Sequence, residues 1–160
     1  MKKLLLSAIF LLGTFVINAQ TTDDMIELLK SDVKTNRKAI ITESMAFTEA
    51  ESKVFWPVYN EFEIEMEKLA AKRIQNIKDY AASYDNMTNE KADQLMKTSY
   101  DFQVSRVDLN KSYFSKFSKV LTPIRASKYM QIENQIQLLV DLSIVSELPL
   151  VKKPVSDAVK

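Results

Sequence analysis

The stretch FTEAESKVFWPVYNEF, residues 47–62, carries five aromatic side chains, the single tryptophan of the chain and one of its four prolines. Near its start, Thr48 and Glu51 have the spacing of a capping box, in which each side chain bonds a free backbone N–H at the beginning of a helix. The aromatic residues then recur at intervals of three and four, which is the spacing of one helical face. The stretch therefore predicts the start of a helix whose buried face is aromatic.

Helical spacing of apolar residues extends on both sides of this stretch. Downstream it continues to about Tyr84, and residues 85–87 are expected to form a turn. Thr88 and Thr122 stand where further helices are expected to begin, and Pro123 occupies a first helical position, where its missing N–H costs nothing. Four helices are expected: from Asp23 to about Glu43, from Glu49 to about Tyr84, from Asn89 to about Leu121, and from Pro123 to about residue 148.

The fold class follows from these helices and from what the chain lacks. Its single glycine, Gly13, lies near the N-terminus, so the rest of the chain has no residue suited to tight hairpin turns between strands. It has no cysteine, so packing alone has to hold the fold. We expect an all-α fold in which the two long helices, joined by a few residues, form an antiparallel hairpin. The fourth helix is expected to bury one apolar face, made of Tyr129, Ile132, Ile136, Leu139 and Ile144.

Pro57 lies about nine residues inside the second expected helix. A proline in a helix interior removes one backbone hydrogen bond and crowds the preceding turn. It is therefore expected to kink the helix or force it to restart. The alternative is local accommodation without consequence.

Residues 1–19 have the pattern of a secretory signal peptide. A basic start and an apolar run precede an expected cleavage site between Ala19 and Gln20. The run is shorter than the ~20 residues that span a bilayer, although an uncleaved anchor is the alternative. We expect a periplasmic protein with one helical domain over residues 20–148 and a flexible C-terminal tail over residues 149–160.

The composition excludes several function classes. The chain has no histidine and no cysteine, which removes the commonest metal ligands and the usual catalytic base and nucleophile. Glu61, Glu63, Glu65 and Glu67 divide between different faces of a helix, so a solvated charged surface is expected there rather than a metal site. The net charge of +1 gives no support for nucleic-acid binding or stable membrane insertion. We expect no enzyme, no cofactor and no metal.

The aromatic series in the opening stretch has two interpretations. Phe55, Trp56, Tyr59 and Phe62 are candidates for a surface that binds client or partner proteins. Helical periodicity more often marks a packed core, and this is the favoured interpretation for three of them. Trp56 lies off the main apolar stripe and is the best candidate for a direct role in binding.

Two short motifs carry a resemblance to a known family. Phe47-Thr48 with Glu51, and Leu121-Thr122-Pro123 with Arg125, each place an apolar residue and a threonine at a helix start. The repeated motif resembles that of the Spy/CpxP family of exported helical proteins, which often has glutamine where this chain has Glu51 and Arg125. The block from residue 40 to residue 62 also resembles exported Bacteroidetes-type proteins described as sensors for extracytoplasmic-function sigma factors.

The resemblance to the Spy/CpxP family implies a fold and a function. It implies that the hairpin is curved and that two copies form a homodimer. It also implies an ATP-independent chaperone that binds unfolded envelope proteins under stress. The alternative is an adaptor that regulates a sigma factor or two-component pathway through one stress-sensing protein partner.

Overall fold

The computed structural model describes residues 36–152, and these residues are almost entirely helical. The chain forms two long helices of 35 and 32 residues, followed by a third of 25 residues. No strand is present between residues 36 and 152. The elements are a first helix over residues 36–45, α2 (Glu49–Ser83), a 3-10 turn (Tyr84–Asn86), α3 (Asn89–Val120) and α4 (Pro123–Glu147).

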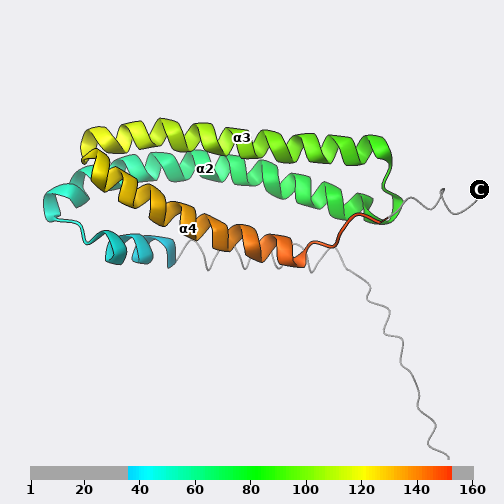
Figure 1. Cartoon of the computed structure of the whole chain (residues 1–160), viewed down its shortest axis with the longest axis horizontal. Coiled ribbons are helices and arrows are strands. Elements are labelled where there is room, and N and C mark those ends of the chain that lie inside the picture. The colour runs from blue at the N-terminus through cyan, green and yellow to red at the C-terminus, as the bar shows by residue number, and fades with distance from the viewer. Residues whose placement is uncertain (1–35, 153–160) are drawn as a thin grey trace, which may run out of the picture.

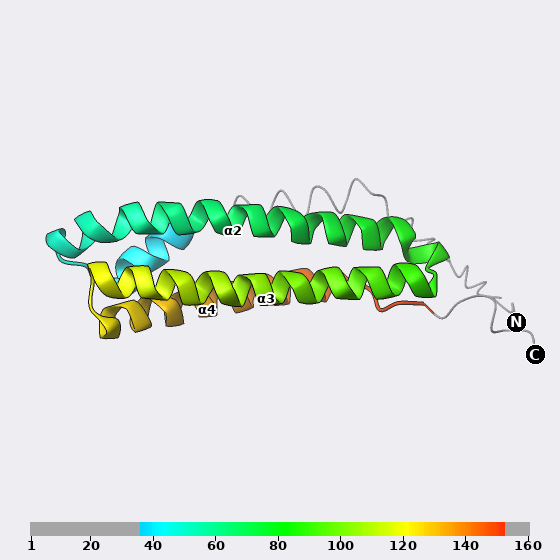
Figure 2. The ribbon, with the colours of Figure 1, turned by 90° about the horizontal axis from the view of Figure 1, so that it is seen from above.

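α2 and α3 form the expected antiparallel hairpin, which confirms the all-α fold class (Figure 1). α4 turns back along α3, and the first helix lies beside α2 and α4, on the side away from α3 (Figures 1 and 2). Both α2 and α4 pack against α3, whereas no Cα atom of α2 lies within 8 Å of a Cα atom of α4. The curvature of the hairpin stays a prediction.

The three predicted helix starts are confirmed. The Thr48 hydroxyl accepts from the backbone N–H of Glu51, and the Glu51 carboxylate accepts from the backbone N–H of Thr48, which completes the capping box. The Thr88 and Thr122 hydroxyls accept from backbone N–H groups three residues later. Since these bonds involve residues three apart, they could be predicted from local sequence alone.

Pro57 does not interrupt α2, which continues through it to Ser83. The Pro57 ring is exposed, so it does not displace the packed face of the helix. A restart of the helix is therefore excluded, and any bend at this position is absorbed within a continuous helix.

The core is concentrated where α2 begins, α3 ends and α4 begins. Aromatic rings fill the space between these helices, and the first helix adds Ile41 and Met45, which are fully buried. Toward the hairpin tip the buried apolar residues are fewer: Ile77 on α2 and Leu95 on α3. The buried side chains of the main cluster are Ile41, Met45, Phe55, Tyr59, Phe62, Tyr113, Phe117, Ala126, Tyr129, Ile132 and Ile136.

One predicted core residue is exposed. Leu139 is 66% exposed, although its spacing placed it on the apolar face of α4. At this level the inward positions of α4 belong to Gln137 and Asp141, whose side chains bond one another and, through Asp141, the arginines of α2 and α3. Leu139 lies on the other side of the helix from them, because two residues turn a helix by about 200°.

The ends of the expected elements match in part. The first helix ends at residue 45, two residues later than expected, and its expected start at Asp23 lies outside the described residues. Residues 149–152 have no regular structure, as expected, but they contact the hairpin tip. The Tyr80 hydroxyl donates to the Pro149 carbonyl at 2.5 Å, and Lys152 pairs with Asp85 at 2.6 Å. The signal peptide and residues 153–160 lie outside the described residues.

The Tyr129 hydroxyl is buried without a hydrogen-bond partner, so we expect Tyr129→Phe to stabilise the protein by about 1 kcal/mol. Tyr59→Phe is the matched control, since the Tyr59 hydroxyl bonds Glu63 at 3.5 Å and its loss should cost up to about 1 kcal/mol. Urea unfolding of both variants measures the difference. A clear loss of stability in Tyr129→Phe would contradict an unpartnered hydroxyl.

Candidate protein-binding surface

The two family-like motifs meet in space. Glu51 is the third residue of α2, and Arg125 is the third residue of α4. Arg125 Nε donates to Glu51 Oε1 at 2.7 Å, and a terminal guanidinium nitrogen donates to Oε2 at 2.9 Å. The guanidinium also lies 5.6 Å from the ring centre of Phe47. The two positions where the Spy/CpxP motif often has glutamine are thus joined here by a two-pronged ion pair.

Glu51 serves both helix starts at once. Its carboxylate accepts from the backbone of Thr48 and from Arg125. The Thr48 backbone N–H, and then the Arg125 side chain, lower the pKa of Glu51 below the usual carboxyl value of 4.5. The side chain therefore stays ionised as the solution becomes mildly acidic.

Two other residues of the second motif, Leu121 and Pro123, lie at the corner between α3 and α4. Leu121 is partly buried against the core, between the end of α3 and the start of α4. Pro123 is exposed in the first turn of α4, where its ring suits the helix start. The motif therefore fixes the α3–α4 corner.

Three of the four candidate surface residues lie in the core. Phe55 is 0% exposed, and Tyr59 and Phe62 are each 1% exposed. The Phe55 ring lies 5.3 Å from that of Phe117 and 4.9 Å from that of Tyr129. The burial agrees with the core interpretation, and none of the three is accessible as a surface in this packing.

Trp56 lies at the edge of the same core. Its indole N–H donates to the Ser52 hydroxyl at 2.9 Å, and its ring packs edge-on against Phe55 and Tyr59. It is half-buried rather than exposed. A contact between Trp56 and a partner would therefore use only part of the ring.

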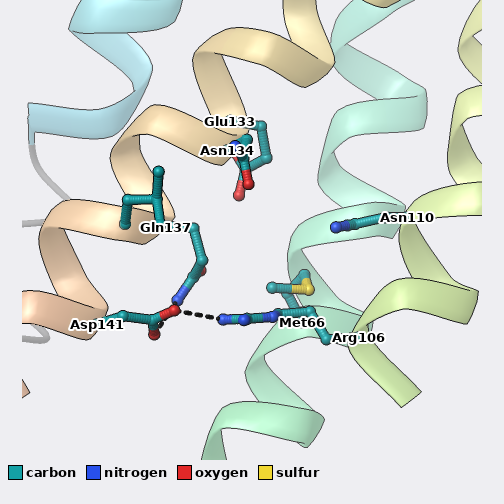
Figure 3. A pocket seen from close by; sticks show the side chains of 8 residues that line it. Met66, Arg106, Asn110, Glu133, Asn134, Gln137 and Asp141 are labelled. Atoms are coloured by element: carbon teal, nitrogen blue, oxygen red, sulfur yellow. Dashed lines mark hydrogen bonds and ion pairs between the residues drawn. The ribbon is translucent and has the colours of Figure 1, made fainter. Parts of the chain in front are cut away.

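A polar layer joins α2, α3 and α4, and Figure 3 shows Arg106, Gln137 and Asp141 of this layer. Asp141 of α4 accepts from Arg73 of α2 and, at 2.9 Å, from Arg106 of α3. Both guanidiniums lie 5.3 Å from the ring centre of Phe102. Burial opposes ionisation of Asp141, but hydrogen bonds from Arg106, Arg73 and Gln137 outweigh it and lower its pKa. This layer ties the three long helices together.

A pocket of about 40 Å³ lies beside this layer. A cavity needs only about 10–15 Å³ of such space to hold a water molecule, so the pocket has room for water. Among the lining side chains, Glu133 Oε2 and Asn110 Oδ1 are buried and have no hydrogen-bond partner. The polar lining of the pocket comes from Arg106, Asn110, Glu133, Asn134, Gln137 and Asp141 (Figure 3).

Glu133 is the one buried charged side chain of the described core. Its other oxygen, Oε1, accepts from Arg37 of the first helix at 2.5 Å. Burial raises the pKa of Glu133, and Arg37 opposes this effect. The pair therefore joins the first helix to α4 across the interior of the bundle.

Three glutamates of α2 form ion pairs with lysines of α3, of the first helix and of α2 itself. Glu61 pairs with Lys116 at 3.2 Å, Glu63 with Lys38 at 3.6 Å, and Glu65 with Lys68 at 2.6 Å. Within residues 36–152, no three metal-ligating side chains come together in a group that could hold a metal ion.

A series of exposed apolar side chains runs along the outer side of α3. With 3.6 residues per turn, its members fall within about 80° of the helix circumference, roughly a third of a turn from the buried face. Tyr100 and Val104 are 58% and 61% exposed. We call this surface the outer stripe; it consists of Met96, Tyr100, Val104, Val107 and Phe114.

Four of the charges beside the outer stripe form two ion pairs. Lys97 bonds Asp93 at 2.6 Å, and Lys111 pairs with Asp108 at 3.9 Å. From Met96 to Phe114 the outer stripe spans about 27 Å at 1.5 Å per residue, and Lys111, which lies within the same arc of the helix, interrupts it between Val107 and Phe114. Charges of both signs border the stripe, so the border is nearly neutral. Such a border selects weakly for the charge of a bound segment.

Two residues of the outer stripe, Tyr100 and Phe114, are expected from the sequence to need a second copy or a client to cover them, because they are aromatic and lie outside the main apolar series. Met96, Val104 and Val107 are not expected there. A signal was present, since positions 96, 100, 104, 107 and 114 repeat at helical spacing next to the buried series. Two apolar series on one helix indicate two covered or binding faces.

Comparisons with protein-family models, curated proteins and solved structures found no match to this chain. In the described part of the chain, none of the helices has the length and apolar character needed to span a membrane.

We expect Glu51→Gln to be less stable than the parent at neutral pH, with a thermal midpoint lower by a few degrees. Because the folded-state pKa of Glu51 is lowered, its contribution is present above the unfolded value of 4.5 and is lost as pH falls through the folded value. The deficit should therefore shrink in acid. Thermal unfolding between pH 3 and 7 tests this, and a deficit independent of pH would contradict it.

We expect Arg37→Met to cost about 3–5 kcal/mol at neutral pH, because it leaves the buried Glu133 carboxylate unpaired. The raised pKa of Glu133 means that the folded state binds a proton more tightly than the unfolded state. The stability lost in Arg37→Met should thus become smaller at pH values below the folded-state pKa of Glu133, where this side chain is neutral. Adding Glu133→Gln should recover part of the loss at neutral pH, and urea unfolding measures both effects.

Proposed function

We propose that the protein binds unfolded segments of exported proteins without ATP, and that the outer stripe of α3 is the binding surface. The observation that carries this function is the row of five large apolar side chains exposed on one side of α3. A row of exposed apolar side chains on one side of a helix is typical of a binding site for another chain.

The character of the outer stripe fits many different clients. Its side chains are aliphatic, aromatic and thioether, and Met96 adds flexibility to the surface. The paired charges beside it place no strong requirement on the charge of the client. Binding of this kind needs no chemistry, which agrees with a chain that lacks histidine and cysteine.

The proposed setting is the periplasm, after cleavage between Ala19 and Gln20, with the protein acting as a homodimer. A second exposed apolar patch, over Leu138, Leu142 and Val145 of α4, supports self-association, because one copy leaves both this patch and the outer stripe uncovered. Light scattering at micromolar concentration tests the dimer, and a monomer mass would contradict it.

We expect Tyr100→Ser with Val104→Ser to weaken client binding about tenfold, as the loss of two side chains at the centre of an interface does. Ile64→Ser is the matched control, because Ile64 is 54% exposed on α2, outside the outer stripe. Suppression of aggregation of several unrelated denatured proteins, at near-stoichiometric amounts and without ATP, is the measurement.

Equal losses in the double variant and in the control would exclude the outer stripe as the binding surface. A parent protein that protects none of the clients, but binds one membrane sensor or anti-sigma factor, would instead favour the adaptor function.

A further inference from the structure

The first helix fills a groove between α2 and α4. The backbones of α2 and α4 do not approach one another closely, since none of their Cα atoms are within 8 Å. Ile41 and Met45 of the first helix are fully buried in the cluster that fills this space, and the helix lies beside both neighbours (Figures 1 and 2). The groove is thus a helix-binding groove whose occupant belongs to the same chain.

Charge complementarity fixes the direction of the occupant. Arg37 bonds the buried carboxylate of Glu133 on α4 at 2.5 Å. Lys38 contacts Glu63 of α2 at 3.6 Å and lies 5.6 Å from the ring centre of Tyr59. Two carboxylates of the groove therefore receive two adjacent basic residues in the first described turn of the seated helix.

The pattern of the seated face is simple. Arg37, Ile41 and Met45 are spaced by four residues, so they share one face of the helix. The first reaches Glu133, and the other two enter the aromatic cluster. Another helix with a basic residue followed by two large apolar residues at successive fourth positions would make the same contacts.

The occupant is held at an energetic cost. The helix is followed by Ala46 with φ of 45°, a left-handed conformation that is unfavourable for a residue with a Cβ atom. The buried Glu133 keeps one oxygen without a partner while the helix is seated. Both features lower the free energy needed to release the helix relative to an unstrained, fully bonded contact.

We propose that this groove is a second interaction surface, which takes an amphipathic partner helix of the pattern basic–x3–apolar–x3–apolar in exchange for residues 36–45. The groove is separate from the outer stripe, and its binding of a partner helix does not depend on the binding of unfolded client proteins. Recognition rests on the Glu133 carboxylate and on the aromatic walls formed by Phe55, Tyr59 and Tyr129.

Two variants at Ala46 change the seating of the first helix without altering the groove. Ala46→Pro forbids the positive φ and so weakens the seated helix. Ala46→Gly removes the strain and strengthens it. The probe is a fluorescent synthetic peptide with the sequence of residues 36–46, added to the full chain.

We expect the peptide to bind Ala46→Pro most tightly and the parent less tightly, because the first helix leaves the groove more easily in the proline variant. Binding to Ala46→Gly should be about fivefold weaker than to the parent, which corresponds to about 1 kcal/mol of relieved strain at residue 46. A peptide with glutamate in place of Arg37 should not bind. Fluorescence anisotropy measures the affinities, and circular dichroism checks that both variants keep their helices. Equal affinity for the proline and glycine variants overturns the proposal.

Hydrogen exchange of the unmodified chain gives an independent test should Ala46→Pro fail to fold. The amides of residues 41–45 are expected to exchange at least about tenfold faster than those of residues 55–62, through release of the first helix alone. Exchange of both segments only together, in global unfolding, overturns the proposal. Addition of the unlabelled peptide should speed exchange in residues 41–45 and leave residues 55–62 protected.

Discussion

The ion pair between Glu51 and Arg125 joins two helix starts that are 74 residues apart in the chain. Each residue is the third of its helix, and each helix start is also capped by its own threonine. The pair therefore sets where α4 begins relative to α2, although the two backbones do not touch. The aromatic rings beside this junction can then span the space between the two helices, which is wider than a direct helix contact would leave.

Much of the fold could be predicted because its determinants are local. The caps at Thr48, Thr88 and Thr122 each depend on residues three apart, and all three are present. The hairpin followed from two long apolar series joined by a short turn. Leu139 shows where this reasoning fails, since periodicity says which residues share a face and not whether a neighbouring helix covers that face.

The sites depend on contacts that periodicity does not contain. Arg37 and Glu133 are 96 residues apart, and a basic residue with an isolated glutamate gives no sequence signal of pairing. Glu51 and Arg125, which stand where the Spy/CpxP motif often has glutamine, are two unconnected residues in the sequence, and their opposite charges explain one another only when the helix starts are side by side. The helical spacing of the outer stripe is present in the sequence, but its exposure depends on which side of α3 the other helices occupy.

The uneven distribution of the core along the hairpin has a dynamic consequence. Nearly all fully buried rings lie at the end where the first helix and α3 stop and α2 and α4 start, while the buried apolar residues toward the tip are Ile77 and Leu95, beside the short contact of residues 149–152. Regions with few buried apolar contacts open locally at lower free energy than the rest of a protein. The hairpin therefore has a gradient of local stability along its length, so that the tip can separate and re-form while the opposite end keeps the helices in register.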